Sequence, residues 1–356
     1  MAFGTVSDPF VAAALWTACG TFATSLLLLV AIAAMRWSLL RRLAREARLA
    51  ARWNPLIAEC AERVPGRVPG LAARDAEAVL LLWARAQETL RGDAQRNLVE
   101  LAARGGLVAQ AERLLCSRNP RQELLAIVVF GHLRDRGKLA FLESLVGGDA
   151  GSLVSLSAAH AMLRIDESRG VARLLSAAAR RDDWAVGQVA AILMDADPAR
   201  VAVHLATAIR TERQAPGAGP GLAQLLRLHT TAHAESLRPA ILEVLRHAVD
   251  AEVLAAALAT LWHPADAGGA RERLEHPAWI VRVEAAQALH RLGAREDLPR
   301  LARLLSDGNW WVRRRAAQAL CALPGVPAEE LRALGASLAD RFTADALAQA
   351  LADLAA

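Results

Sequence analysis

Residues 279–289 read WIVRVEAAQAL and residues 310–320 read WWVRRRAAQAL, so eight of eleven positions are identical at a displacement of 31 residues. Self-similarity at a fixed period of this length is typical of a repeat protein. In each copy the Val, the Ala-Ala pair and the final Leu fall on one face of a helix, and the small Ala side chains let a neighbouring helix approach closely. We therefore expect each copy to be the second helix of an antiparallel pair.

Fainter copies of the same pattern begin near residues 122, 154, 186 and 253, and a double-length gap leaves room for a degenerate copy around residue 221. Leu-rich segments between the copies, such as residues 138–146 and 298–305, are expected to form the first helices. One pair cannot bury its own apolar face, so stacking of pairs supplies the core. The sequence predicts an all-α chain in which residues 116–356 form an α-solenoid.

The composition favours helices and limits the possible functions. The 356 residues are 54 % hydrophobic and contain no Tyr, which excludes a disordered chain and disfavours a strand-rich one. Four cysteines lie too far apart to form a CxxC metal site or a disulfide framework, so a reducing compartment fits best. No phosphate-binding loop, nucleophile elbow or dinucleotide fingerprint occurs, and we expect no enzyme activity and no cofactor.

An uncharged run near the N-terminus indicates a membrane anchor. Residues 9–35 hold no charge over 27 positions, and about 20 apolar residues suffice to cross a bilayer as a helix. Residues 36–52 then carry a net charge of +5, equal to the formal net charge of the chain. Since arginines on a short flank stay in the cytoplasm, we expect residues 1–8 outside a bacterial inner membrane and the array inside. A cleavable signal peptide would need a basic segment before a shorter apolar run.

The segment after the span, residues 36–54, is a basic amphipathic stem with a Trp at each end. One interpretation is that it lies on the membrane surface and binds anionic lipid headgroups; the other is that the membrane helix continues into solvent. The residues expected at the membrane surface are Arg36, Trp37, Arg41, Arg42, Arg45, Arg48, Arg52 and Trp53. Residues 55–115, with a Pro-Gly loop at 64–70 and a helix over about 75–90, form a helical adapter.

Three tryptophans, Trp184, Trp279 and Trp310, occupy the same repeat position, two residues before the Val, and Trp311 doubles the last. Equal repeat positions predict a row along the array. Because Trp is a favoured interface anchor, this row could bind a protein partner, with Arg314 contacting an acidic group. Alternatively, each indole fills the seam between neighbouring repeats. We expect a protein partner, and no nucleic acid, since the array outside the stem is close to neutral.

At these positions the chain resembles the HEAT family, and in particular the HEAT-like repeats of the phycobilin-lyase type, whose second helix reads V-R-x-x-A-A-x-A-L. The resemblance implies a ladder in which a turn Asp and the helix Arg link neighbouring repeats, and Asp307 and Arg313 fit these roles. Ser155 and Gly187 stand where Arg is expected, so we expect the ladder to be interrupted in the middle.

The resemblance also implies a function. Membrane-anchored HEAT-repeat proteins of this layout look like accessories of envelope machines, for example polysaccharide synthases, so we expect a non-catalytic scaffold that binds and positions or regulates a membrane-associated protein. The alternative is a lyase or isomerase acting on a small ligand, as in phycobilin lyases.

Two other features remain open in the sequence. His229 and His233 stand one helical turn apart before Glu235, but no third ligand is apparent and we expect no metal. Residues 214–221, QAPGAGPG, break any helix and form either a hinge or a long loop.

Overall fold

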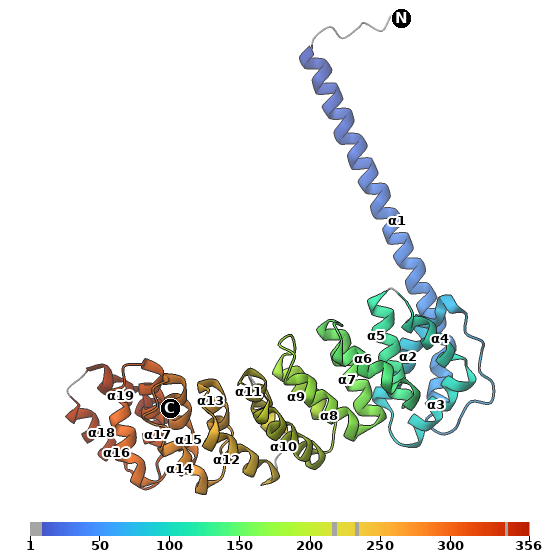
Figure 1. Cartoon of the computed structure of the whole chain (residues 1–356). Coiled ribbons are helices and arrows are strands. Elements are labelled where there is room, and N and C mark those ends of the chain that lie inside the picture. Colours follow the sequence, from blue (N-terminus) through green and yellow to red (C-terminus); the bar gives the residue numbers. More distant parts are fainter. Residues whose placement is uncertain (1–8, 118, 216–218, 232–234, 339–340, 356) are drawn as a thin grey trace, which may run out of the picture. The chain divides into compact units, whose positions relative to one another are not determined.

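The computed structural model describes residues 9–117, 119–215, 219–231, 235–338 and 341–355. Throughout this part of the chain the regular elements are helices, which confirms the all-α prediction. The chain divides into two compact units, residues 1–132 and 133–356 (Figure 1). The expected external segment 1–8, His233 and residues 216–218 of the predicted breaker lie outside the described residues.

The N-terminal unit is built around one long helix. Helix α1 runs without a break from Pro9 to Glu59 and is followed by a 3₁₀ turn (Ala73–Asp75). The other helices of this unit are α2 (Ala76–Thr89), α3 (Asp93–Arg104), α4 (Leu107–Leu115) and α5 (Pro120–Leu133). The helix expected over about 75–90 is therefore present as α2.

The two ends of α1 have different environments. Its first part is apolar, with a mean hydropathy of 2.1 in its most apolar window, and none of that window is buried in the protein. Its last part packs on α2, and Trp53 and Cys60 are buried. In the same core, the indole N–H of Trp83 donates to the Leu98 carbonyl at 2.8 Å. Helix α1 is thus long and apolar enough to cross a membrane and is fixed to the folded unit at its far end.

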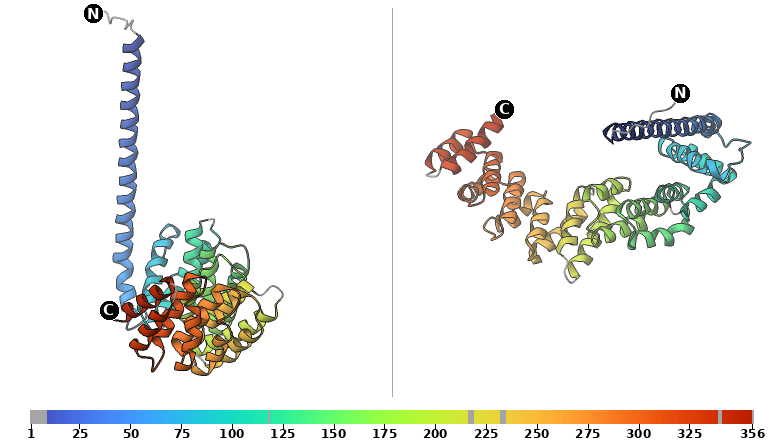
Figure 2. Two further views of the ribbon diagram at one scale, coloured as in Figure 1. Left: turned by 90° about the vertical axis from the view of Figure 1, so that its left-hand side faces the viewer. Right: turned by 90° about the horizontal axis from the view of Figure 1, so that it is seen from above.

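The C-terminal unit consists of helices packed in succession, as the views in Figures 1 and 2 show. Its first half contains α6 (Leu139–Gly147), α7 (Ser152–Ile165), α8 (Glu167–Ala178), α9 (Val186–Leu193), α10 (Pro198–Gln214) and α11 (Gly219–Arg227). Its second half contains α12 (Arg238–His247), α13 (Ala251–Ala259), α14 (Ala267–Arg271), α15 (Trp279–Leu292), α16 (Leu298–Leu304), α17 (Trp310–Ala322), α18 (Ala328–Ser337) and α19 (Arg341–Ala355).

The second helices of the repeats lie where the sequence pattern predicts them. Helices α7, α9, α11, α13, α15 and α17 each begin close to a predicted copy, including the degenerate one near residue 221. Neighbouring second helices pack on each other in the order α11, α13, α15, α17. Val281, Ala285 and Leu289 of α15 are buried, as are their counterparts in α17. The face predicted from the Val, Ala-Ala and Leu positions therefore forms the core of the array.

Two boundaries differ from those expected. Helix α10 ends at Gln214, but residues 219–221 open α11 instead of extending the loop, because Pro is tolerated in the first turn of a helix. The compact units divide at 132/133, whereas the adapter was expected to end at residue 115. Helix α5, which carries the copy at residue 122, accordingly lies in the N-terminal unit.

Candidate protein-binding site

Arginine–aspartate pairs link successive repeats of the array. Arg238 of α12 binds Asp266, which precedes α14, with Nη2 to Oδ1 at 2.7 Å. Arg271 of α14 binds Asp297, which precedes α16, with Nε to Oδ1 at 2.6 Å and Nη2 to Oδ2 at 3.0 Å. Asp297 is fully buried, and burial is the largest single influence on its pKa and raises it. The hydrogen bonds from Arg271 and the Ala294 backbone and the charges of Arg271 and Arg300 together outweigh burial, so the pKa of Asp297 lies below its usual value. These pairs fix one repeat against the next.

The predicted pairing of Asp307 with Arg313 is wrong in one respect. Asp307 binds Arg282 of the preceding repeat, with Nε to Oδ2 at 2.7 Å and Nη2 to Oδ1 at 2.9 Å. Arg313 instead donates to the backbone carbonyl of Asp307 at 2.8 Å. The reason is geometric. Both Arg282 and Arg313 donate through one nitrogen to the turn that precedes their own helix. The other two nitrogens of Arg282 face the turn of the next repeat. The ladder therefore runs between repeats, as the resemblance implied, with a shifted partner.

Trp184 does not belong to an exposed row. It is 2 % exposed, and its indole N–H donates to the hydroxyl of Ser155 in the preceding repeat at 3.0 Å. The guanidinium of Arg181 covers the ring at 5.4 Å. The expectation of Trp184 as a protein-binding residue is thus wrong, and the seam-filling interpretation holds for it. The physical reason is that Trp184 lies before the helix, since α9 begins only at Val186.

The other members of the row are exposed, at the starts of two adjacent helices. Trp279 and Trp310 are the first residues of α15 and α17, two adjacent helices, and are 45 % and 48 % exposed. Trp311 is 49 % exposed and lies edge-on to Trp310, with the ring centroids 4.7 Å apart. The Arg314 guanidinium lies 5.4 Å from the centroid of Trp310. We call Trp279, Trp310, Trp311 and Arg314 the aromatic patch.

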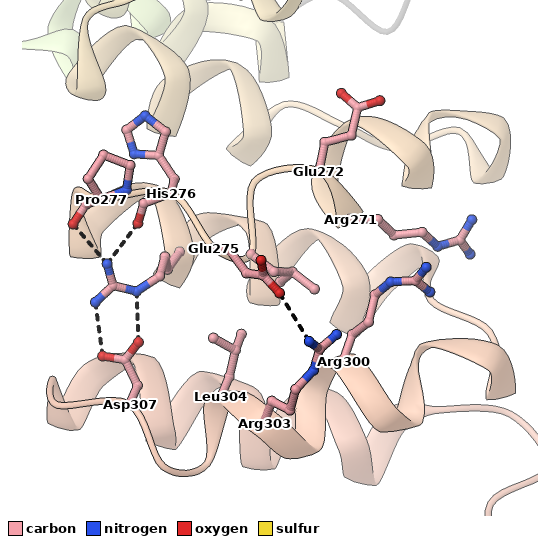
Figure 3. Close-up of a pocket in the computed structure, with 11 residues that line it drawn as sticks. Arg271, Glu272, Glu275, His276, Pro277, Arg300, Arg303, Leu304 and Asp307 are labelled. Atoms are coloured by element: carbon pink, nitrogen blue, oxygen red, sulfur yellow. Dashed lines mark hydrogen bonds and ion pairs between the residues drawn. The ribbon is translucent and has the colours of Figure 1, made fainter.

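A charged hollow of about 620 Å³ lies between the segments that lead into α15 and α17 (Figure 3). Pro277 and Asp307, at its edge, precede the first residues of α15 and α17 by two and three positions. Asp307, on one side of the view in Figure 3, pairs with Arg282, and nearer the middle Arg303 pairs with Glu275 at 3.2 Å. The remaining charged residues that line the hollow are Arg271, Glu272 and Arg300. Because the lining holds four arginines and three carboxylates, this surface suits a partner with mixed charges.

A second, more apolar hollow of about 540 Å³ lies where α13 ends. Leu237, Ile241, Leu261 and Trp262 line it, and Trp262 is 49 % exposed. Polar groups at its wall are His229, Thr230, Glu235, Thr260 and Arg291. Within the described residues no group of three metal-ligating side chains occurs, and the metal prediction for the His229–His233 pair stays untested because His233 lies outside them.

The predicted membrane-surface residues all lie on α1, in the N-terminal unit, but their surroundings differ. Trp37 is 61 % exposed, and the guanidinium of Arg41 lies 4.8 Å from the centroid of its ring. Arg45 binds Asp75 through Nε at 2.7 Å. Trp53 is 2 % exposed and packs in the protein core, so its expected place in a headgroup layer is wrong. Because α1 is unbroken from the apolar run to Glu59, the stem continues the apolar helix rather than forming a separate surface helix.

Comparisons with known proteins find one family match, in the C-terminal part. The family model of HEAT repeats matches residues 238–320 and 267–352, so the segment with the ladder and the aromatic patch is similar to HEAT repeats. A comparison with curated proteins finds no match. A crystal structure of an engineered protein is similar at 18 % identity over 84 % of this chain and 94 % of that chain, with a TM-score of 0.26. Such a low score carries no argument about fold or function.

Trp262 and the two ion pairs made by Asp266 and Asp297 were not predicted from the sequence. The spacing holds a signal for these pairs, because Asp266 and Asp297 are 31 residues apart, the displacement that separates Trp279 from Trp310. Trp262 follows α13 and has no counterpart in the other copies, so no periodic signal could have found it.

Proposed function

We propose that this protein is a single-pass anchor of the bacterial inner membrane whose HEAT-repeat array is a non-catalytic scaffold in the cytoplasm. The observation that carries the proposal is the aromatic patch. Three half-exposed indoles present on the order of 300 Å² of surface, close to the largest apolar patch that a monomer ordinarily exposes. Aromatic residues and Arg are the residue types that most often anchor protein interfaces.

The patch is rigidly presented, which lowers the entropic cost of binding. Trp279 and Trp310 project from α15 and α17, whose inner faces are buried in the core of the array. Asn309 caps α17 by accepting from the Trp311 N–H at 2.9 Å. The adjoining ladder holds the two repeats in register through Arg282 and Asp307. We infer a partner that offers an apolar pocket or flat apolar surface, with a carboxylate that approaches Arg314.

The anchor supports a partner that is itself associated with the membrane. From Ala13 onward the apolar part of α1 is exposed, and burying it in lipid removes that apolar surface from water. Arginines follow the apolar run and only Asp8 precedes it among the charged side chains, which favours the N-terminus outside. The identity of the partner, including the expected polysaccharide synthase, stays a prediction.

A photo-crosslinking amino acid placed at Trp311 of the full-length chain tests the proposal in living cells. The expected result is one major crosslinked membrane-associated protein, absent when the same amino acid replaces Leu153, which is 64 % exposed on another repeat. A chain that crosslinks nothing from position 311, or the same set of proteins from both positions, would contradict the proposal.

A second candidate function is the binding and conversion of a small ligand, which the hollow beside Trp262 favours. Its wall combines apolar side chains with His229, Glu235 and Arg291, the combination found in small-molecule sites. A ligand that copurifies with the chain and is lost in Trp262→Ala and Leu237→Gln variants would support this function, whereas ligand-free protein would count against it.

A further inference from the structure

A hollow at the root of the apolar helix lies between α1 and α2. It measures about 850 Å³ and is lined by residues 42–50 of α1, residues 74–85 of α2 and its preceding turn, and residues 119 and 121. Its apolar lining consists of Leu43, Ala47, Leu49, Ala50, Ala78, Leu81 and Leu82. Leu43 and Leu81 are 51 % and 42 % exposed, so apolar surface faces solvent here. We call this hollow the α1–α2 groove.

The rim of the α1–α2 groove is more basic than acidic. Its cations are Arg42, Arg45, Arg74, Arg85 and Arg121, and its anions are Glu46, Asp75 and Glu77. All three carboxylates already have partners: Glu46 binds Arg42 at 2.9 Å, Asp75 binds Arg45 at 2.7 Å, and Glu77 accepts from Gln122 at 3.0 Å.

The positive charge of the rim is not neutralised within the protein. Arg85 and Arg121 are exposed, and among the described residues no carboxylate lies within 4.0 Å of either guanidinium. Nη2 of Arg45 is buried and has no hydrogen-bond acceptor, although Nε of the same side chain binds Asp75. Because that nitrogen is buried, the donors open to a ligand are those of Arg85 and Arg121. The groove thus offers donors for one anionic group.

The apolar lining is continuous with the apolar run of α1. Leu39 and Leu40 are 53 % and 57 % exposed and lead from Met35 to Leu43 at the groove. The groove begins at Arg42, seven residues or about 10 Å of helix after Met35, so its near end follows the apolar run directly and lies close to the headgroup layer of an anchored chain.

We propose that the α1–α2 groove binds one anionic phospholipid, with the phosphate at Arg85 and Arg121 and an acyl chain along Leu43 and Leu81. The inference rests on the membrane anchoring in the proposed function. It differs from a general attraction of the stem to lipid because its two cations belong to α2 and α5, and because the arginines of α1 that lie outside the groove, such as Arg41 and Arg48, have no part in it.

Retention of lipid by the full-length chain tests the inference. The chain is reconstituted in nanodiscs of phosphatidylcholine and phosphatidylglycerol, transferred to mild detergent and weighed by native mass spectrometry. The wild type is expected to keep one phosphatidylglycerol. An R85Q/R121Q variant is expected to keep it about tenfold less, because two charge-assisted hydrogen bonds are lost. The matched control R63Q/R67Q removes two exposed arginines of the same unit outside the groove and is expected to behave as the wild type.

Equal retention by R85Q/R121Q and R63Q/R67Q would overturn the inference. Glycerol phosphate, the headgroup without acyl chains, should displace the lipid poorly, and efficient displacement would overturn the acyl-chain contact. Leu81→Gln should weaken lipid retention, because Leu81 makes that contact. All these residues are exposed, so the variants are expected to fold, which circular dichroism checks. Resistance of the chain to carbonate extraction from membranes is scored separately. A chain that resists extraction but keeps no lipid refutes only the groove, whereas an extractable chain refutes the anchor.

Discussion

The indole N–H of Trp184 donates to the hydroxyl of Ser155 at 3.0 Å, and Ser155 occupies the repeat position at which Arg282 stands in a later repeat. In that later repeat the arginine reaches forward to Asp307 of its neighbour. In the earlier repeat the side chain of Ser155 is short, and Trp184 of the next repeat fills the space between the two repeats. Neighbouring repeats are thus joined at this position in both places, by an ion pair in one and by a buried indole in the other.

Replacing Trp184 should destabilise the array more than replacing an exposed tryptophan. We expect Trp184→Ala to lower the free energy of unfolding by about 3–5 kcal/mol, because it empties a buried site. Trp184→Phe should cost less, since it keeps most of the ring and loses one hydrogen bond of about 1 kcal/mol. Urea denaturation followed by circular dichroism measures both. Trp279→Ala is the control, and a loss as large as that of Trp184→Ala would contradict the assignment.

The buried aspartates of the ladder make the array sensitive to acid. The pKa values of Asp297 and Asp307 lie below their usual values, because the arginine and backbone hydrogen bonds and the neighbouring arginine charges together outweigh the large opposing effect of burial. Each carboxylate therefore stabilises the fold fully above the ordinary Asp pKa of about 3.9, and this contribution disappears as the pH falls through the lower pKa of the folded state.

A D297N/D307N variant should be less stable than the wild type at pH 7, by about 3 kcal/mol for the fully buried position, and should lose less stability below pH 4. Thermal denaturation at a series of pH values gives both quantities. Parallel pH profiles for the two proteins would show that the ladder contributes nothing to the acid response.

Gly170 permits the close crossing of α7 and α8. A Cβ at this position would lie 2.3 Å from the Cα of Leu163, so Gly170→Ala should destabilise the array by about 1–3 kcal/mol. Gly187 is the matched control, because it also lies in a helix and a Cβ there meets nothing within 4 Å. Gly187→Ala should be neutral or stabilise by up to about 1 kcal/mol. Denaturation midpoints rank the variants, and the opposite order would refute the packing at Gly170.

The accessibility of cysteines reports the orientation in the membrane. Cys116 is exposed, whereas Cys60 is buried and burial raises the pKa of its thiol to about 11, so Cys116 should react first with a maleimide. If the array lies in the cytoplasm, a membrane-impermeant maleimide should label Cys116 in permeabilised cells and leave it unlabelled in intact spheroplasts. Labelling of Cys116 in intact spheroplasts would place the array outside. A C116S variant is the control for the site of labelling.

The sequence was sufficient for the helices because the repeat pattern is local. The spacing of Val281, Ala285 and Leu289 marks one helical face whatever the neighbouring repeats do, and that face is buried as predicted. Even the degenerate copy near residue 221 was located by the regular spacing alone, and it forms α11.

The surroundings of individual side chains could not be predicted from spacing. Trp184 and Trp310 stand at equal distances from their Val residues, yet α9 starts two residues after the first tryptophan and α17 starts at the second. Because the helices start at different points, the indole of Trp184 packs between two repeats and that of Trp310 stays exposed. Trp53 was placed at a membrane surface because it ends an amphipathic segment, but packing of α1 on the folded N-terminal unit buries it.

Binding of a protein partner by the aromatic patch is tested by comparing partner capture by three chains. These are the wild type, a W279A/W310A/W311A variant and an L153A/M194A/V249A control, which removes three exposed apolar side chains elsewhere on the array. Each chain is crosslinked in cells, purified in detergent and analysed by quantitative mass spectrometry. We expect one membrane-associated protein, captured equally by the wild type and the control and at least about tenfold less by the tryptophan variant, with unchanged folding stability. Equal capture by all three chains would contradict partner binding at the aromatic patch.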